Sequence, residues 1–170
     1  FEAAPVFQGS VSGYASGGSI PPAPAPALSD TIDKFPFASD SNATDVGNLT
    51  VARNESTGQS SSVSGYNSGG ADPSITNVID KFPFATDTNA TDVGDLSTAI
   101  FIGSGQSSST SGYASGGNNP PVNIIQKFPF AVDTNATDIG DLTQARRDHS
   151  GQSSSSFGYN SGGFSPPWVN

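Results

Sequence analysis

The side chains best suited to binding a metal ion lie in an acidic and amide-rich segment that occurs three times. Residues 40–45 read Asp-Ser-Asn-Ala-Thr-Asp, and related segments span 87–92 and 133–138. Calcium prefers hard oxygen ligands of this kind, but the spacing, the glycine and the terminal glutamate of an EF-hand are missing. Asp and Asn also close turns by hydrogen bonding to the nearby backbone. We therefore expect a capped turn at each segment and predict no metal site.

Side chains that could perform catalysis are few. His149 is the only histidine, the chain has no cysteine, and no Gly-x-Ser-x-Gly motif presents a serine as a nucleophile. Because no partner nucleophile is evident, we expect His149 to lie in a solvated loop rather than to act as a general base. We predict no catalytic residue, no cofactor and no enzymatic activity.

The acidic segments belong to a longer unit that the chain repeats. A Lys-Phe-Pro-Phe motif begins at Lys34, Lys81 and Lys127, which are 47 and 46 residues apart, and each copy ends in Gly-Tyr-x-Ser-Gly-Gly. The first Phe of the motif precedes that Tyr by 31 residues in every copy. A fixed inner part joined by linkers of variable length is typical of a supersecondary module copied in tandem.

The repeat divides the chain into five parts. Residues 1–18 are the end of a preceding repeat, 19–70 are repeat 1 with a proline-rich linker, 71–117 are repeat 2, 118–163 are repeat 3, and 164–170 start the next linker. Neither end resembles a natural terminus, so we expect a fragment of a longer polypeptide.

The composition excludes several classes of partner. The net charge is −9, with 6 Lys and Arg residues against 15 Asp and Glu residues. No basic patch is available to neutralise phosphates, so we expect no binding to nucleic acid. No apolar run approaches the roughly 18 residues of a membrane helix, so we expect no membrane insertion. Without cysteine, the chain has no disulfide framework.

The pattern of the repeat predicts strands rather than helices. Gly and Pro interrupt every segment, and no window shows a helical period of apolar residues. We predict an all-β protein with four short strands in each repeat, in the second copy around 77–84, 91–96, 97–102 and 107–112. The Gly/Ser-rich run has an invariant length, which suits a crowded strand near a central axis better than a free linker.

Apolar side chains at fixed positions predict the core. Phe82 and Phe84 are two residues apart and therefore point to the same face of a strand. Pro83 lies between them and cannot donate to a neighbouring strand, so we expect it at an edge or a strand end. We predict that five residues of the second copy, with their counterparts in the other copies, are buried between modules: Phe82, Phe84, Val93, Leu96 and Tyr113.

The order of these signals resembles the kelch repeat, which forms one blade of a β-propeller. Residues 128–135 fit the aromatic strand and Asp/Asn turn of that family, Arg146 and Arg53 fit its arginine, and Tyr159 before Gly162 fits its end. The second copy has Ile100 in place of the arginine, and the tryptophan of the family is absent from all three copies. The resemblance implies tandem kelch-like propeller blades of about 46–47 residues.

The amino-acid sequence of residues 81–117, like that of the other two copies, is similar to repeats in structural proteins of marine, cyanophage-type bacteriophage virions. This resemblance implies a non-enzymatic virion component, in the tail, a fibre or a decoration, located in the extracellular particle. Its expected partners are other virion structural proteins or further copies of itself. The alternative is an adhesion module that binds a host-surface glycan through the loops between repeats.

Two further features depend on this setting. Five asparagines begin Asn-x-Ser/Thr sequons, which carry glycans in secreted eukaryotic proteins and which we expect to be unmodified in a phage. They are Asn42, Asn48, Asn54, Asn89 and Asn135. Trp168, the single tryptophan, could anchor a partner, stack on a sugar or pack into a neighbouring blade.

The number of repeats leaves the ends of the array open. A common propeller has roughly 4 to 8 blades, and this chain holds three and a half units. A longer chain, several chains in one ring, or a stacked fibre would each complete the array. Because exposed strand edges pair with other strands, we expect this chain to associate.

Overall fold

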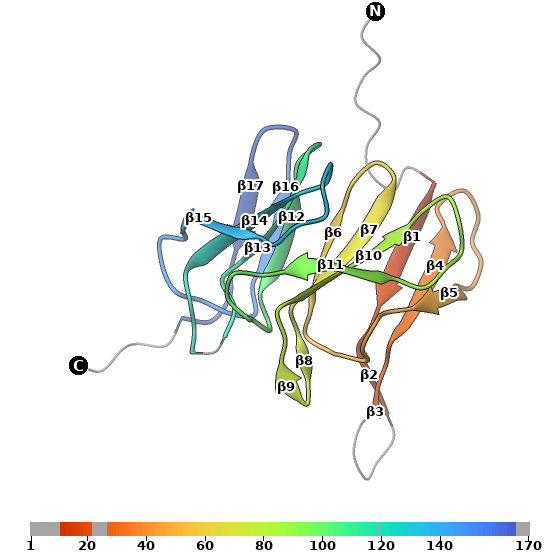
Figure 1. Ribbon diagram of the computed structural model, residues 1–170, viewed down its shortest axis with the longest axis horizontal. Coiled ribbons are helices and arrows are strands. Elements are labelled where there is room, and N and C mark those ends of the chain that lie inside the picture. Colours follow the sequence, from red (N-terminus) through yellow and green to blue (C-terminus); the bar gives the residue numbers. More distant parts are fainter. Residues whose placement is uncertain (1–10, 22–26, 119, 166–170) are drawn as a thin grey trace, which may run out of the picture.

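The chain folds entirely into β-strands and loops. Figure 1 shows the computed structural model, which describes residues 11–21, 27–118 and 120–165. Every regular element in these ranges is a strand, and the strands form small antiparallel sheets. The prediction of an all-β protein is therefore confirmed.

Two sheets have four strands each, joined in sequence order as antiparallel meanders. We call them the second sheet, β6-β7-β10-β11, and the third sheet, β12-β13-β14-β15. Their bounds are Thr57–Ser60 (β6), Ser64–Ser68 (β7), Val78–Pro83 (β10), Thr91–Asp95 (β11), Ser104–Ser107 (β12), Ser111–Ser115 (β13), Ile124–Pro129 (β14) and Thr137–Asp141 (β15). Each sheet thus combines the end of one sequence repeat with the beginning of the next.

Smaller sheets flank these two in the described part of the chain. The first sheet has the order β1-β4-β5, and the fourth sheet consists of β16 and β17. Two short hairpins, β2-β3 and β8-β9, lie in the linkers. The bounds are Ser12–Ser16 (β1), Ser19–Ile20 (β2), Ala27–Leu28 (β3), Thr31–Pro36 (β4), Thr44–Asn48 (β5), Ala71–Asp72 (β8), Ser74–Ile75 (β9), Ser150–Ser153 (β16) and Gly158–Ser161 (β17).

The predicted positions of two strands in each repeat were wrong. The expected strands at 77–84 and 91–96 agree with β10 and β11, and Pro83 ends β10 as predicted. The expected strands at 97–102 and 107–112 are instead a loop, a strand at Ser104–Ser107 and a strand at Ser111–Ser115. Ile100 is buried in that loop, and Ile102 there has a positive φ of 54°, which a strand does not allow.

Aromatic side chains join the first sheet to the second and the second sheet to the third. The Tyr14 ring of the first sheet stacks on Phe84 of the second sheet with 4.8 Å between ring centroids, and it also contacts Phe82. Tyr66 of the second sheet stacks in the same way on Phe130 of the third sheet at 4.9 Å. These contacts lie in the two hydrophobic clusters of the molecule. The repeat therefore builds one interface twice.

The glycine before each tyrosine makes room for the phenylalanine of the neighbouring strand. Gly65 and Phe82 are directly opposite in the β7–β10 pair, and the Phe82 ring lies where a Cβ at Gly65 would be. Gly112 and Phe128 repeat this arrangement in the third sheet. Packing of an aromatic ring over a cross-strand glycine shields the backbone and fixes the register.

The predicted core is confirmed in part. Phe82 and Leu96 are buried, whereas Phe84, Val93 and Tyr113 are partly buried. Counterparts on the outermost sheets are exposed, including Phe37 at 60% and Tyr159 at 51%. Position in the repeat determines which face a side chain occupies, but a neighbouring sheet is needed to cover it.

Candidate functional site

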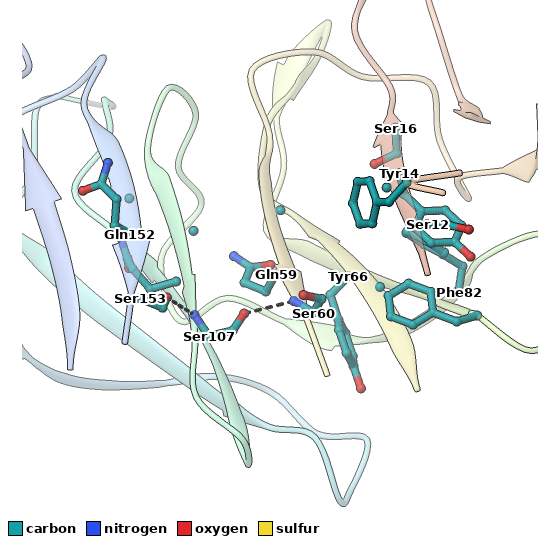
Figure 2. Close-up of a pocket in the computed structure, with 18 residues that line it drawn as sticks. Ser12, Tyr14, Ser16, Gln59, Ser60, Tyr66, Phe82, Ser107, Gln152 and Ser153 are labelled. Atoms are coloured by element: carbon teal, nitrogen blue, oxygen red, sulfur yellow. Dashed lines mark hydrogen bonds between the residues drawn. The ribbon is translucent and has the colours of Figure 1, made fainter. Parts of the chain in front are cut away.

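The main candidate site is a groove of about 410 Å³ beside the inner strands β6, β12 and β16. Three Gly-Gln-Ser triplets, at 58–60, 105–107 and 151–153, line one side. Aromatic residues of the first and second sheets, among them Tyr14, Tyr66 and Phe82, line the rest (Figure 2). The groove thus combines amides, hydroxyls and aromatic rings.

Close backbone contact between the inner strands explains the triplets. Strand β12 contacts both β6 and β16. A Cβ at Gly105 would clash with the carbonyl oxygen of Gly58, and a Cβ at Gly151 would clash with that of Gly105. Only glycine permits this approach, which agrees with the predicted crowding of small residues.

Serine side chains connect neighbouring inner strands along one side of the groove. The backbone N–H of Ser60 donates to Oγ of Ser107 at 3.0 Å, and the N–H of Ser107 donates to Oγ of Ser153 at 2.9 Å (Figure 2). Ser107 and Ser153 therefore each accept a hydrogen bond from the preceding inner strand. This ladder repeats with the sheets and holds their inner edges together.

The glutamines of the triplets differ in their exposure to solvent. Gln59 and Gln106 are both 5% exposed. Nε2 of Gln59 donates to Oγ1 of Thr57, and Nε2 of Gln106 donates to Oγ of Ser104, each at 2.8 Å. Gln152 on the last inner strand is exposed, and its Oε1 accepts a hydrogen bond from Ser161. Of the three amides, that of Gln152 is the most accessible to a ligand.

The groove suits a neutral polar ligand better than acid–base chemistry. Its described lining contains no Asp, Glu, His, Lys or Arg. Burial raises the pKa of both Tyr14 and Tyr66, so these phenols stay protonated at neutral pH. Aromatic faces beside amides and hydroxyls are the groups that bind sugars by stacking and hydrogen bonding.

The predicted acidic turns serve as contacts between sheets. Asp87 forms an ion pair with Lys34 of the preceding sheet at 3.0 Å, and Asp133 pairs with Lys81 at 2.8 Å. The hydrogen bond to Asp87 raises the pKa of Lys34. The described residues contain no group of three or more acidic, His or Cys side chains that could hold a metal ion.

Amide oxygens of the same turns bind the preceding sheet. Oδ1 of Asn89 accepts a hydrogen bond from the N–H of Asn48 at 3.1 Å, and Oδ1 of Asn135 accepts one from Asp95 at 3.0 Å. The aspartate ending each turn caps its own backbone, as Asp92 does by accepting from Gly94. Among the other sequons, Asn54 donates to Ser19 at 3.0 Å. Trp168 lies outside the described residues.

The prediction of a solvated loop for His149 was wrong. This residue is only 8% exposed and lies against Gly116 of the third sheet. Burial lowers the pKa of His149, and the nearby Arg146 lowers it further. The ring is therefore neutral at physiological pH. His149 holds the repeat position of Gly103 and Ser56 in the other copies.

A buried ion pair in the second sheet was not predicted. Arg53 and Asp80 are both fully buried, and Nη2 of Arg53 lies 2.8 Å from Oδ2 of Asp80. Nε of Arg53 also donates to Oδ1 of Asn67 at 3.1 Å, and Thr50 donates to both Asp80 oxygens. A buried charge must be paired and hydrogen-bonded in this way.

The third sheet replaces this polar trio with neutral residues. Ile100, Ala114 and Gln126 stand at the positions of Arg53, Asn67 and Asp80. Gln126 is held by Thr98, whose N–H donates to Oε1 at 2.7 Å. The three positions change together between the sheets. Alignment of the repeats against each other was the sequence signal that could have revealed them.

Comparisons with known proteins do not assign the chain to a family. No protein-family model matches the sequence, and no curated protein matches it significantly. In the part of the chain that the structure describes, no helix is long and apolar enough to cross a membrane.

Proposed function

We propose that this chain is a non-enzymatic structural component of a phage virion, built from repeated β modules. The observation that carries the proposal is that one inter-sheet interface is built twice from equivalent residues. Tyr14 with Phe84 and Tyr66 with Phe130 form its apolar part, and lysine–aspartate pairs form its polar part. Modules that stack by one rule extend a structure to any length.

The sheets are consistent with kelch-like propeller blades in an open array, or in a longer or multi-chain ring. Four antiparallel strands in sequence order, with crowded glycine-bearing inner strands, are what such blades have in common. The assignment to a phage rests on the sequence resemblance of the repeat. Localisation in the virion, and partners among virion proteins or further copies, follow from that setting.

Quantitative mass spectrometry of purified phage particles tests the proposal. Peptides of this chain should be present in a fixed number of copies per particle, in amounts comparable to known structural proteins. Peptides found only in the infected-cell lysate, and not in particles banded by density, would refute the virion role.

A second candidate is a module that binds host-surface glycans, and the groove favours it. Aromatic rings, exposed Gln152 and the serine ladder offer stacking and hydrogen bonds without a charged group. A glycan array with the folded protein should detect binding that Gln152→Ala weakens. Uniform absence of binding would count against this function.

A further inference from the structure

The fourth sheet carries an incomplete copy of the polar trio found in the second sheet. Arg146 aligns with Arg53, Thr143 aligns with Thr50, and Asn160 aligns with Asn67. Arg146 binds Gly162 O and Thr143 Oγ1, both at 3.3 Å, and its Nε is buried without a hydrogen bond to the described residues. The position of Asp80, on a strand paired with β17, is not supplied by the described chain.

Asn160 holds the position of Asn67 and contacts the same serine position of the preceding sheet. Asn67 donates to Oγ of Ser16 in the preceding sheet at 2.9 Å. Asn160 contacts the equivalent serine through its amide oxygen, because Oδ1 of Asn160 accepts a hydrogen bond from Oγ of Ser115 at 3.0 Å. The amide of Asn160 and the guanidinium of Arg146 therefore lie beside the free edge of β17. In the second sheet the equivalent arginine binds both the asparagine and an aspartate of the adjacent strand.

The first sheet carries an aspartate that lacks such partners among the described residues. Asp33 in β4 aligns with Asp80, but it faces Ala15 of β1, where Asp80 faces Asn67 of β7. Asp33 makes no side-chain hydrogen bond or ion pair with the described residues. In the third sheet the alanine Ala114 is matched with the neutral Gln126. The pairing of Ala15 with Asp33 therefore departs from the rule that the two complete sheets follow.

The remaining interface contacts are also divided between the two ends. Tyr113 and Lys127 of the third sheet hold the positions of Tyr66 and Lys81, and the described residues offer Lys127 no ion pair. Phe37 and Asp40 of the first sheet hold the positions of Phe84 and Asp87 and are exposed. One end thus has the tyrosine and lysine half of the interface, and the other has the phenylalanine and aspartate half.

We propose that the free edge of β17 binds the β4–β5 hairpin of a second copy, in place of that copy's β1. The hairpin would complete a four-stranded sheet, β16-β17 with β4-β5, in the order of the second sheet. Asp33 of the second copy would then bind Arg146 and Thr143, as Asp80 binds Arg53 and Thr50. Phe37 and Asp40 of that copy would cover Tyr113 and Lys127. Strand addition at a free edge satisfies backbone groups along the whole strand.

The association is heterologous, so each copy keeps one free end and chains can grow. This inference deepens the proposed structural role and rests on it only for its biological setting. Absence of the chain from virions would remove that role and leave the association in solution intact.

Sedimentation velocity over a range of concentrations tests the proposal with the full 170-residue chain. We expect concentration-dependent association, weakened at least tenfold by Asp33→Gln and by Arg146→Ile. Glu55→Gln makes the same charge change at an exposed position and should have no effect. The combined variant Asp33→Gln, Asn160→Ala and Arg146→Ile installs the neutral trio of the third sheet and should restore association.

A monomer at all concentrations would overturn the proposal, as would association that these substitutions leave unchanged. Circular dichroism must show that each variant is folded.

A labelled peptide of residues 76–96, which carries Asp80, gives a second measurement, and a peptide of residues 122–142, with Gln126, provides its natural control. The first peptide should bind at least tenfold more tightly. If the protein binds the peptide but stays monomeric, the free edge of β17 binds another polypeptide. That result would overturn the proposal that a second copy occupies the edge.

Discussion

Conversion of the buried trio in the second sheet to the neutral trio of the third gives a stringent test of the packing rule. Arg53→Ile alone leaves Asp80 fully buried with its charge unpaired, because both side chains are inaccessible to solvent. Breaking a buried ion pair by removing one partner costs about 3–5 kcal/mol. Asp80→Gln alone leaves the guanidinium unpaired and should cost a similar amount.

The combined variant Arg53→Ile, Asn67→Ala and Asp80→Gln should lose far less. The third sheet accommodates Ile100, Ala114 and Gln126 at these positions with the backbone N–H of Thr98 bound to Gln126, and Thr50 is available for the same role. Replacing a buried pair by well-packed neutral residues is often nearly neutral, so we expect the combined variant to recover all but about 1 kcal/mol.

The assay is urea unfolding monitored by far-ultraviolet circular dichroism, and the free energies of unfolding are compared at a constant m-value. The two single variants serve as controls for the combined variant. Additive losses, in which the combined variant is less stable than either single variant, would refute the claim that the three positions form one unit.

Three further predictions concern stability. Gly105→Ala should lower the free energy of chemical unfolding by about 1–3 kcal/mol, because its Cβ would clash with the Gly58 carbonyl oxygen. Gly58→Ala is the control and should cost less than about 1 kcal/mol, because its Cβ meets no described atom within 4 Å. Equal losses would contradict the crowding of the inner strands. Phe82→Ala should cost about 3–5 kcal/mol and exposed Phe37→Ala less than about 1 kcal/mol in dilute protein, and a small loss at Phe82 would mean that its face is not core. Burial lowers the pKa of His149 below its ordinary 6.5, so the unfolded state binds more protons and the free energy of unfolding should fall as the pH drops below about 6.5. His149→Gln should reduce the slope of the unfolding free energy against pH. An unchanged slope would show that the ring does not contribute.

The sequence predicts the parts of this fold that depend on local pattern. Alternating Phe82 and Phe84 with Pro83 between them identify β10 and its end, and Asp92 identifies a capped turn. The inner strand Ser104–Ser107 was misplaced because Gly and Ser have weak strand preference, and contact with the neighbouring inner strands is what stabilises it there.

Contacts between distant residues required the structure. Arg53 and Asp80 are 27 residues apart and come from adjacent copies of the repeat, so neither position indicates the other locally. His149 follows a charged stretch typical of a loop, yet the loop between β15 and β16 places it against Gly116. Tertiary packing decided the environment of both residues.

Cross-linking between the two ends gives the most direct test of the central claim, that the ends of the chain are two halves of one interface. In the second sheet Tyr66 and Lys81 are directly opposite in the β7–β10 pair. The equivalent positions are Tyr159 in β17 and Lys34 in β4, and the chain has no native cysteine. Mixing the single variants Tyr159→Cys and Lys34→Cys under mild oxidation should give a disulfide between positions 159 and 34 of different chains, identified by mass spectrometry. Absence of this cross-link at concentrations where the protein associates would contradict the account.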